Sequence, residues 1–174
     1  MKKRILFLLA LYFMWLPLLA IQKPVFMLYH HALASGCSLI DYLKVITHGL
    51  LLDCTVSGYL TVIPLLCILV SVWLPGTFYQ KLIKGYFLAA GLLVAAIFAV
   101  DVALYGYWGF RLDATLFFYL QSPTDAIASV PIGTFFLQFL LFLIYAYGIY
   151  WVFKRFVVPL FPTTPAHNRL GGTI

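Results

Sequence analysis

The chain has 174 residues, a length typical of one domain, and 64% of them are hydrophobic whereas only 9% are charged. Soluble domains contain ~45–50% apolar and ~25% charged residues, so this composition excludes a water-soluble globular protein. The net charge is +6, but the basic residues lie between apolar runs, which favours a membrane protein over a nucleic-acid-binding one.

Four apolar stretches are long enough to cross ~30 Å of hydrocarbon as helices, which takes ~20 residues. The first follows three basic residues, the second ends at Pro75-Gly76, and the fourth follows Pro131, which is favourable at a helix start. The expected spans are about 5–28, 55–73, 82–104 and 132–153. Residues 1–156 are therefore predicted to form an all-α, polytopic transmembrane helical bundle.

The first stretch has an alternative interpretation, because a basic start before an apolar run also describes a cleaved secretory signal peptide. The run is long, contains Pro17 and has no clear Ala-x-Ala cleavage site, which favours a retained helix. Whether Lys23 divides this stretch into a membrane helix and a surface segment stays open.

The basic residues predict which side of the membrane each connection occupies. Only Lys23, Lys44 and Arg111 lie in the first and third connections. The other eight of the eleven lie at the two ends of the chain and in the second connection: Lys2, Lys3, Arg4, Lys81, Lys84, Lys154, Arg155 and Arg169. The positive-inside rule thus predicts a multi-pass protein of the cell (inner) membrane with both termini in the cytoplasm.

Short amphipathic helices at the membrane interface are expected in both outer connections. In residues 105–130, Asp113 can cap a helix that runs to about 120, and residues 122–125 form a capping-box pattern. In residues 30–53, apolar side chains recur at helical spacing, at Leu39, Ile40, Leu43, Ile46 and Leu50.

Asp101 leads the candidate functional residues, because it follows sixteen uncharged positions within the third span. A carboxylate at that depth needs a partner or water. Tyr105, one helical turn later, can donate a hydrogen bond to it, and Arg111 can reach it if the chain turns at an intervening glycine. One interpretation is a contact that pins the outer loop. The other is a lipid-headgroup or phosphate site on Arg111, assisted by Asp113, since guanidinium donors suit phosphate oxygens.

No catalytic, cofactor-binding or metal-ligating set is predicted in this chain. It lacks the serine-hydrolase, phosphate-loop and zinc-protease motifs, and it contains no glutamate. His30 and His31 point about 100° apart on a helix, and His48 and Asp53 lie on different helix faces. The three cysteines form no Cys-x-x-Cys pair. A disulfide between the cysteines at 37 and 54 is an alternative to free thiols.

Two stretches carry a family resemblance. Residues 100–129 begin Val-Asp101-Val-Ala-Leu-Tyr105-Gly-Tyr-Trp-Gly-Phe-Arg111-Leu-Asp113, and an upstream stretch reads Leu-Leu-Leu-Asp53-Cys-Thr-Val-Ser-Gly-Tyr. They resemble the membrane domain of lipoteichoic-acid-synthase-like proteins, in particular the Bacteroidetes type. These are membrane-anchored phosphoglycerol transferases of the sulfatase/alkaline phosphatase superfamily.

The resemblance implies five membrane helices and then a large extracytoplasmic domain, whose threonine nucleophile and divalent metal transfer phosphoglycerol or phosphoethanolamine groups from lipids. This chain ends at Ile174 after four expected spans, and residues 157–174 are expected to be a cytoplasmic tail or loop leading to a missing fifth helix. The catalytic domain, with its metal, is therefore expected outside this chain.

Three functions follow from these patterns. The first is an N-terminal membrane anchor of such a transferase, inactive alone, with the lipid bilayer and anionic headgroups as its partners. The second is a complete small membrane protein that acts as an assembly or interaction subunit. The third is a small transporter, which the nearly charge-free spans disfavour. Nucleic acid is not an expected partner.

Overall fold

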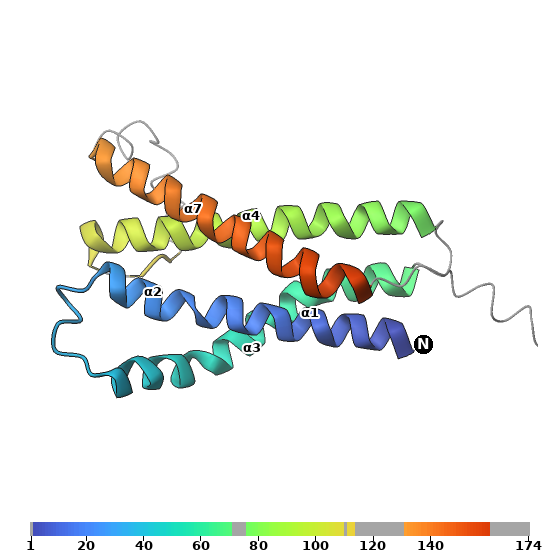
Figure 1. Cartoon of the computed structure of the whole chain (residues 1–174), viewed down its shortest axis with the longest axis horizontal. Helices are drawn as coiled ribbons and strands as arrows, with labels where there is room; N and C mark the ends of the chain where they lie inside the picture. The colour runs from blue at the N-terminus through green and yellow to red at the C-terminus, as the bar shows by residue number, and fades with distance from the viewer. Residues whose placement is uncertain (1, 71–75, 110, 114–130, 161–174) are drawn as a thin grey trace, which may run out of the picture.

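The computed structural model describes residues 2–70, 76–109, 111–113 and 131–160, and these ranges are almost entirely helical (Figure 1). The helices run back and forth along one long axis, as expected for a bundle that crosses a membrane repeatedly. Their bounds are α1 Lys2–Ala20, α2 Gln22–Tyr29, α3 Leu39–Val70, α4 Gly76–Trp108 and α7 Ile132–Val152. A π turn, Phe153–Val157, and a 3-10 turn, Val158–Leu160, follow α7.

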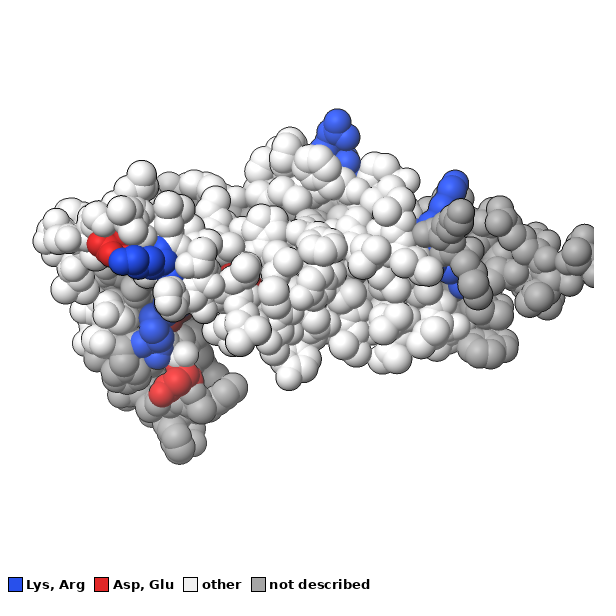
Figure 2. Space-filling model, turned by 90° about the horizontal axis from the view of Figure 1, so that it is seen from below, with Lys and Arg blue, Asp and Glu red and all other residues white. Residues whose placement is uncertain are grey.

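Within the described ranges, four helical segments are long and apolar enough to span a bilayer: Lys3–Tyr29, Leu39–Val70, Gln80–Tyr107 and Ile132–Leu160. Large apolar side chains such as Phe136 and Ile144 of α7 point outward, where lipid rather than water solvates them. On the face shown in Figure 2, most charged side chains lie toward the two ends and the surface between them is largely uncharged. The predicted multi-pass, all-α transmembrane fold is therefore confirmed.

The first span is divided at Ile21, where α1 ends and α2 begins. Pro24 has no N–H, so the Ala20 carbonyl loses its usual helical partner at this point. The Ile21 N–H still donates to the Pro17 carbonyl at 3.0 Å, and the Val25 N–H donates to the Ile21 carbonyl at 3.2 Å. The two helices consequently follow nearly one line in Figure 1.

The second span begins at Leu39 rather than near position 55, because the expected surface helix and the expected span form one helix, α3. The predicted boundary followed from Asp53, since a charge inside a membrane helix is costly. The structure removes this objection by pairing Asp53 with Lys23 of α2. No proline lies between Leu39 and Pro64, so nothing in the backbone ends the helix earlier.

The third and fourth spans also extend past their predicted ends. Helix α4 covers 33 residues rather than the predicted range 82–104, and the π and 3-10 turns extend the last segment to Leu160. At 1.5 Å per residue, α4 is roughly 50 Å long and exceeds ~30 Å of hydrocarbon, so its basic and polar ends extend past the apolar layer. The predicted interfacial helices within residues 114–130 lie outside the described residues.

The core lies toward the end of the bundle that holds the N-terminus. The α1 side chains of Phe7, Leu11 and Trp15 are fully buried there. The rings of Phe87 in α4 and Phe153 in the π turn lie 3.9 Å apart between their centroids. These side chains belong to one buried cluster that joins α1, α4 and the last span.

A tyrosine completes the backbone hydrogen bonding of α3. Pro64 cannot donate to the carbonyl of Leu60, four residues earlier, so that carbonyl lacks its helical partner. The Tyr86 hydroxyl of α4 donates to the Leu60 oxygen at 2.8 Å. The proline therefore creates an acceptor that a neighbouring helix uses, which ties α3 to α4 within the membrane.

Candidate functional site

Asp101 and Arg111 form an ion pair near the end of α4. Nη2 of Arg111 lies 2.6 Å from Oδ2 of Asp101, and the backbone N–H of Leu112 donates to Oδ1 at 2.7 Å. The chain turns back at Gly109, whose φ of +72° is accessible to glycine but strained for other residues. This turn carries Arg111 and Leu112 back over the last turns of α4, where they reach the buried carboxylate.

Tyr105 does not make the contact expected for it. Among the described residues, no hydrogen bond joins Tyr105 to Asp101, whose two carboxylate oxygens contact Arg111 and the Leu112 N–H instead. The Tyr105 ring instead packs against Phe26 and His30, at centroid distances of 4.9 and 5.0 Å.

Phe26 and His30 bring α2 into the same site. The guanidinium carbon of Arg111 lies 4.4 Å from the centre of the Phe26 ring, a cation–π contact. Nε2 of His30 lies 3.1 Å from the Val102 carbonyl, an arrangement in which a protonated Nε2 donates to that oxygen. We call the group Phe26, His30, Asp101, Tyr105 and Arg111 the arginine cluster.

The arginine cluster presents a positively charged group in a fixed position. The Asp101 side chain is only 6% exposed, whereas that of Arg111 is 57% exposed. Asp101 contacts one edge of the guanidinium and Phe26 one face, while more than half of the Arg111 side chain stays exposed. Asp113 is exposed two residues further along the chain. The helix expected after Asp113 lies outside the described residues.

A second ion pair, between Lys23 of α2 and Asp53 of α3, was not predicted. Nζ of Lys23 lies 2.6 Å from Oδ1 and 2.5 Å from Oδ2 of Asp53, and the two side chains are 16% and 8% exposed. Gly49 makes room for it, since a Cβ at that position would lie 2.0 Å from Cε of Lys23. The sequence did contain a signal for this pair, because Lys23 and Asp53 are opposite charges that each interrupt an apolar stretch.

The remaining candidates do not assemble into a site. Nδ1 of the exposed His48 lies 2.7 Å from the Lys44 carbonyl, whereas Asp53 pairs with Lys23. Cys37 and Cys54 are free thiols, as is Cys67. In the part of the chain that the structure describes, no three His, Cys, Asp or Glu side chains are grouped closely enough to hold a metal ion.

The sites thus differ in what they can do. Lys23 and Asp53 neutralise each other inside the bundle, whereas the arginine cluster keeps hydrogen-bond donors available at its surface. Donors on a guanidinium suit an anion such as a phosphate. A comparison with protein-family models, curated proteins and solved structures found no match for this chain.

Proposed function

We propose that this chain is a membrane anchor that binds an anionic lipid headgroup through Arg111, as the membrane part of a lipoteichoic-acid-synthase-like transferase. The observation that carries the headgroup site is the fixed but exposed guanidinium of Arg111. The activity of the intact protein would be phosphoglycerol or phosphoethanolamine transfer, on a domain that these residues do not contain. No reacting group is assigned to this chain.

The geometry supports a headgroup site because the guanidinium is already positioned. Asp101 and Phe26 restrict the rotation of the Arg111 side chain. Binding a phosphate therefore costs little additional side-chain entropy. Lipid phosphates lie at the level where membrane helices end, and Arg111 follows the end of α4. A bilayer also supplies the ligand at high local concentration, so a modest affinity is enough to fill the site.

The positive-inside rule supports placing the arginine cluster on the extracytoplasmic side, with both termini in the cytoplasm. The stretch that resembles the transferases includes Asp101, Tyr105, Arg111 and Asp113, which lie in or beside this cluster. An anchor of this kind confines a headgroup-transferring domain to the surface that holds its substrate, which raises the effective concentration of that substrate.

The headgroup site is tested by replacing Arg111 with glutamine or lysine in the full chain. Native mass spectrometry of the detergent-purified protein would count bound phosphatidylglycerol against phosphatidylcholine with identical acyl chains. Loss of one charge-assisted phosphate contact lowers affinity about tenfold, so Arg111→Gln should weaken one phosphatidylglycerol site by that factor. Arg111→Lys should recover part of it, because lysine keeps the charge without the planar fork.

Lys44→Gln is the matched control, because Lys44 is an exposed cation in the same outer region, 3.6 Å from Asp41. This variant should bind both lipids as the wild type does. Unchanged lipid binding in an Arg111→Gln protein whose thermal unfolding shows that it is folded would leave Arg111 as a loop-pinning residue only.

The transferase assignment has a separate test in the coding sequence beyond codon 174. An adjoining sulfatase-like domain, in frame or separated by a frameshift, is the expected result. Unrelated neighbouring genes would contradict the transferase assignment and favour an interaction subunit, without affecting the result at Arg111.

A further inference from the structure

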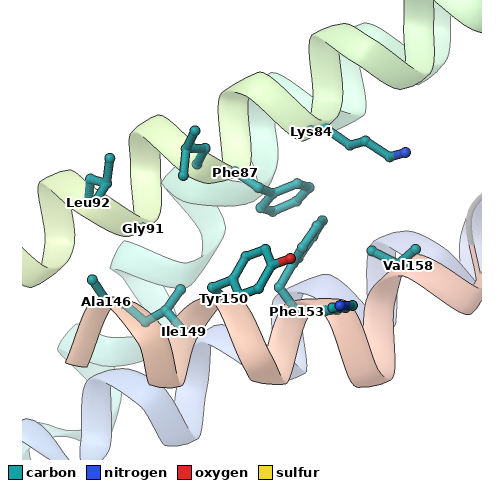
Figure 3. Close-up of a pocket in the computed structure, with 11 residues that line it drawn as sticks. Lys84, Phe87, Gly91, Leu92, Ala146, Ile149, Tyr150, Phe153 and Val158 are labelled. Carbon is teal, nitrogen blue, oxygen red and sulfur yellow. The ribbon is translucent and has the colours of Figure 1, made fainter. Parts of the chain in front are cut away.

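A cavity of about 400 Å³ lies between α4 and the last span, far from the arginine cluster (Figure 3). This volume falls within the ~300–1,000 Å³ common for small-molecule sites. Its lining side chains are apolar apart from two lysines and one tyrosine hydroxyl. The lining comprises Lys84, Phe87, Leu88, Gly91, Leu92, Ala146, Ile149, Tyr150, Phe153, Lys154 and Val158.

The cavity has a charged end and an apolar end. Helices α4 and α7 run in opposite directions, so Lys84 near the start of α4 and Lys154 after α7 lie at the same end. Figure 3 shows Leu92 and Ala146 at the other end of the cavity. Leu92 lies eight positions after Lys84, which corresponds to roughly 12 Å along the helix axis. An apolar groove of this length thus leads away from two ammonium groups.

Gly91 and the π turn shape the two ends of this cavity. A Cβ on Gly91 would lie 3.1 Å from Cγ2 of Ile149, so glycine allows the two helices to approach closely beside the groove. At the other end, the Val158 N–H donates to the Phe153 carbonyl, five residues back, in place of an α-helical bond. Pro159 lies in the 3-10 turn that follows directly and cannot donate to the carbonyl of Arg155, so the α-helical pattern does not resume there. Such π turns often occur at functional sites.

Lys84 and Lys154 remain exposed beside this groove. Nζ of Lys154 lies 5.8 Å from the centre of the Tyr150 ring, which orients the ammonium group near the charged end. Basic pockets between membrane helices on the cytoplasmic side commonly bind the headgroups of anionic lipids. Charge complementarity therefore favours an anionic amphiphile over a neutral helix or a neutral lipid.

We infer that this cavity binds one anionic phospholipid, with its phosphate between Lys84 and Lys154 and an acyl chain along Phe87, Leu88 and Leu92. The occupant belongs to the leaflet at the basic end of the bundle, which is opposite to the leaflet served by Arg111. The two sites are separate, so this inference does not depend on the proposed function.

The test uses the full chain in detergent, titrated with phosphatidylglycerol or phosphatidylcholine of identical acyl composition and followed by native mass spectrometry. One basic residue near an anionic lipid contributes about fivefold, which equals about 1 kcal/mol. The Lys84→Gln/Lys154→Gln variant should therefore lose about 25-fold in phosphatidylglycerol affinity and change little toward phosphatidylcholine. Lys81→Gln, a cation of the same helix end outside the lining, should retain the wild-type preference.

The acyl groove has its own matched pair of variants. Leu88 and Leu93 of α4 are both 60% exposed, but only Leu88 lines the cavity. Leu88→Trp should fill the groove and reduce binding of both lipids, whereas Leu93→Trp should not. Glycerol phosphate, which has the headgroup charge without the chains, should fail to compete at millimolar concentration.

Three results would overturn this assignment. Equal wild-type affinity for the two lipids would remove the headgroup site, and competition by glycerol phosphate would indicate a site for soluble phosphates. A dimer that Leu88→Trp dissociates and Leu93→Trp does not would assign the groove to a second copy of the chain. Persistence of the lysine-dependent site in an Arg111→Gln protein separates it from the site of the proposed function.

Discussion

Lys23 and Asp53 lie 30 positions apart in the sequence and form a nearly buried ion pair between α2 and α3. An unpaired charge in hydrocarbon is costly, whereas a paired lysine and aspartate satisfy each other. This pair therefore allows α3 to continue as one helix through a position where hydropathy alone would end the span.

Removing one member of this pair should destabilise the bundle strongly. Lys23→Met or Asp53→Leu alone leaves an uncompensated charge, for which a loss of about 3–5 kcal/mol is expected. The Lys23→Met/Asp53→Leu double variant should recover most of that loss, because no charge remains to be buried. Unfolding of the purified protein in mixed micelles would measure the three free energies. Additive losses in the double variant would show that the two charges act independently.

Gly49→Ala should disturb the same ion pair by a steric clash, without changing any charge. The added Cβ would lie 2.0 Å from Cε of Lys23, so the lysine must move away from Asp53. A loss of about 1–3 kcal/mol in unfolding free energy is expected, as for other overpacked sites.

Gly58→Ala in the same helix is the control, because a Cβ there meets nothing within 4 Å. That variant should be neutral or stabilising by about 0.5–1 kcal/mol, since alanine favours helix more than glycine does. Equal unfolding free energies for the two variants would contradict this role of Gly49.

Tyr86→Phe should cost about 1 kcal/mol, because the Leu60 carbonyl then lacks a donor within the membrane. The size of this loss should depend on Pro64, which is the residue that leaves the Leu60 carbonyl without a backbone donor. In a Pro64→Ala background, the restored backbone N–H can bond Leu60 itself, so Tyr86→Phe should cost much less. A double-mutant cycle on unfolding free energies measures this coupling. The same cost in both backgrounds would show that Tyr86 does not compensate for the proline.

The proposed orientation predicts which residues a membrane-impermeant thiol reagent can reach in intact cells. Cys37 lies exposed in the connection between α2 and α3 and should react from outside. With Cys37, Cys54 and Cys67 replaced by alanine, Lys81→Cys should react only after the membrane is permeabilised. The reverse pattern would place both termini outside the cytoplasm and remove the extracytoplasmic position proposed for Arg111.

The four spans and the all-α class were predictable from sequence because hydropathy along a helix is a local property. About 20 apolar residues suffice to cross the hydrocarbon, whatever the neighbouring helices do. The exact helix ends were not predictable in this way. Charges such as Lys81 end an apolar run, but they do not end a helix, and the structure continues α4 beyond Lys81 to Gly76.

The contact between Asp101 and Arg111 was also predictable from the sequence, since the two residues lie ten positions apart and the glycines between them allow the chain to turn back. The sequence could not assign the remaining contacts. Tyr105 turned toward Phe26 and His30 because α2 packs beside the end of α4, and sequence spacing carries no information on that packing.

Composition is sufficient to identify lipid as the solvent of this protein, because a chain with so few charges folds in a bilayer, as helices whose backbone groups are satisfied internally. Which polar groups meet depends on how the helices pack in three dimensions. Lys23 reaches Asp53, Tyr86 reaches Leu60, and Lys84 and Lys154 lie at one end of an apolar groove. The two members of each pair lie on separate helical segments, and their placement depends on helix packing rather than on residue spacing along the chain.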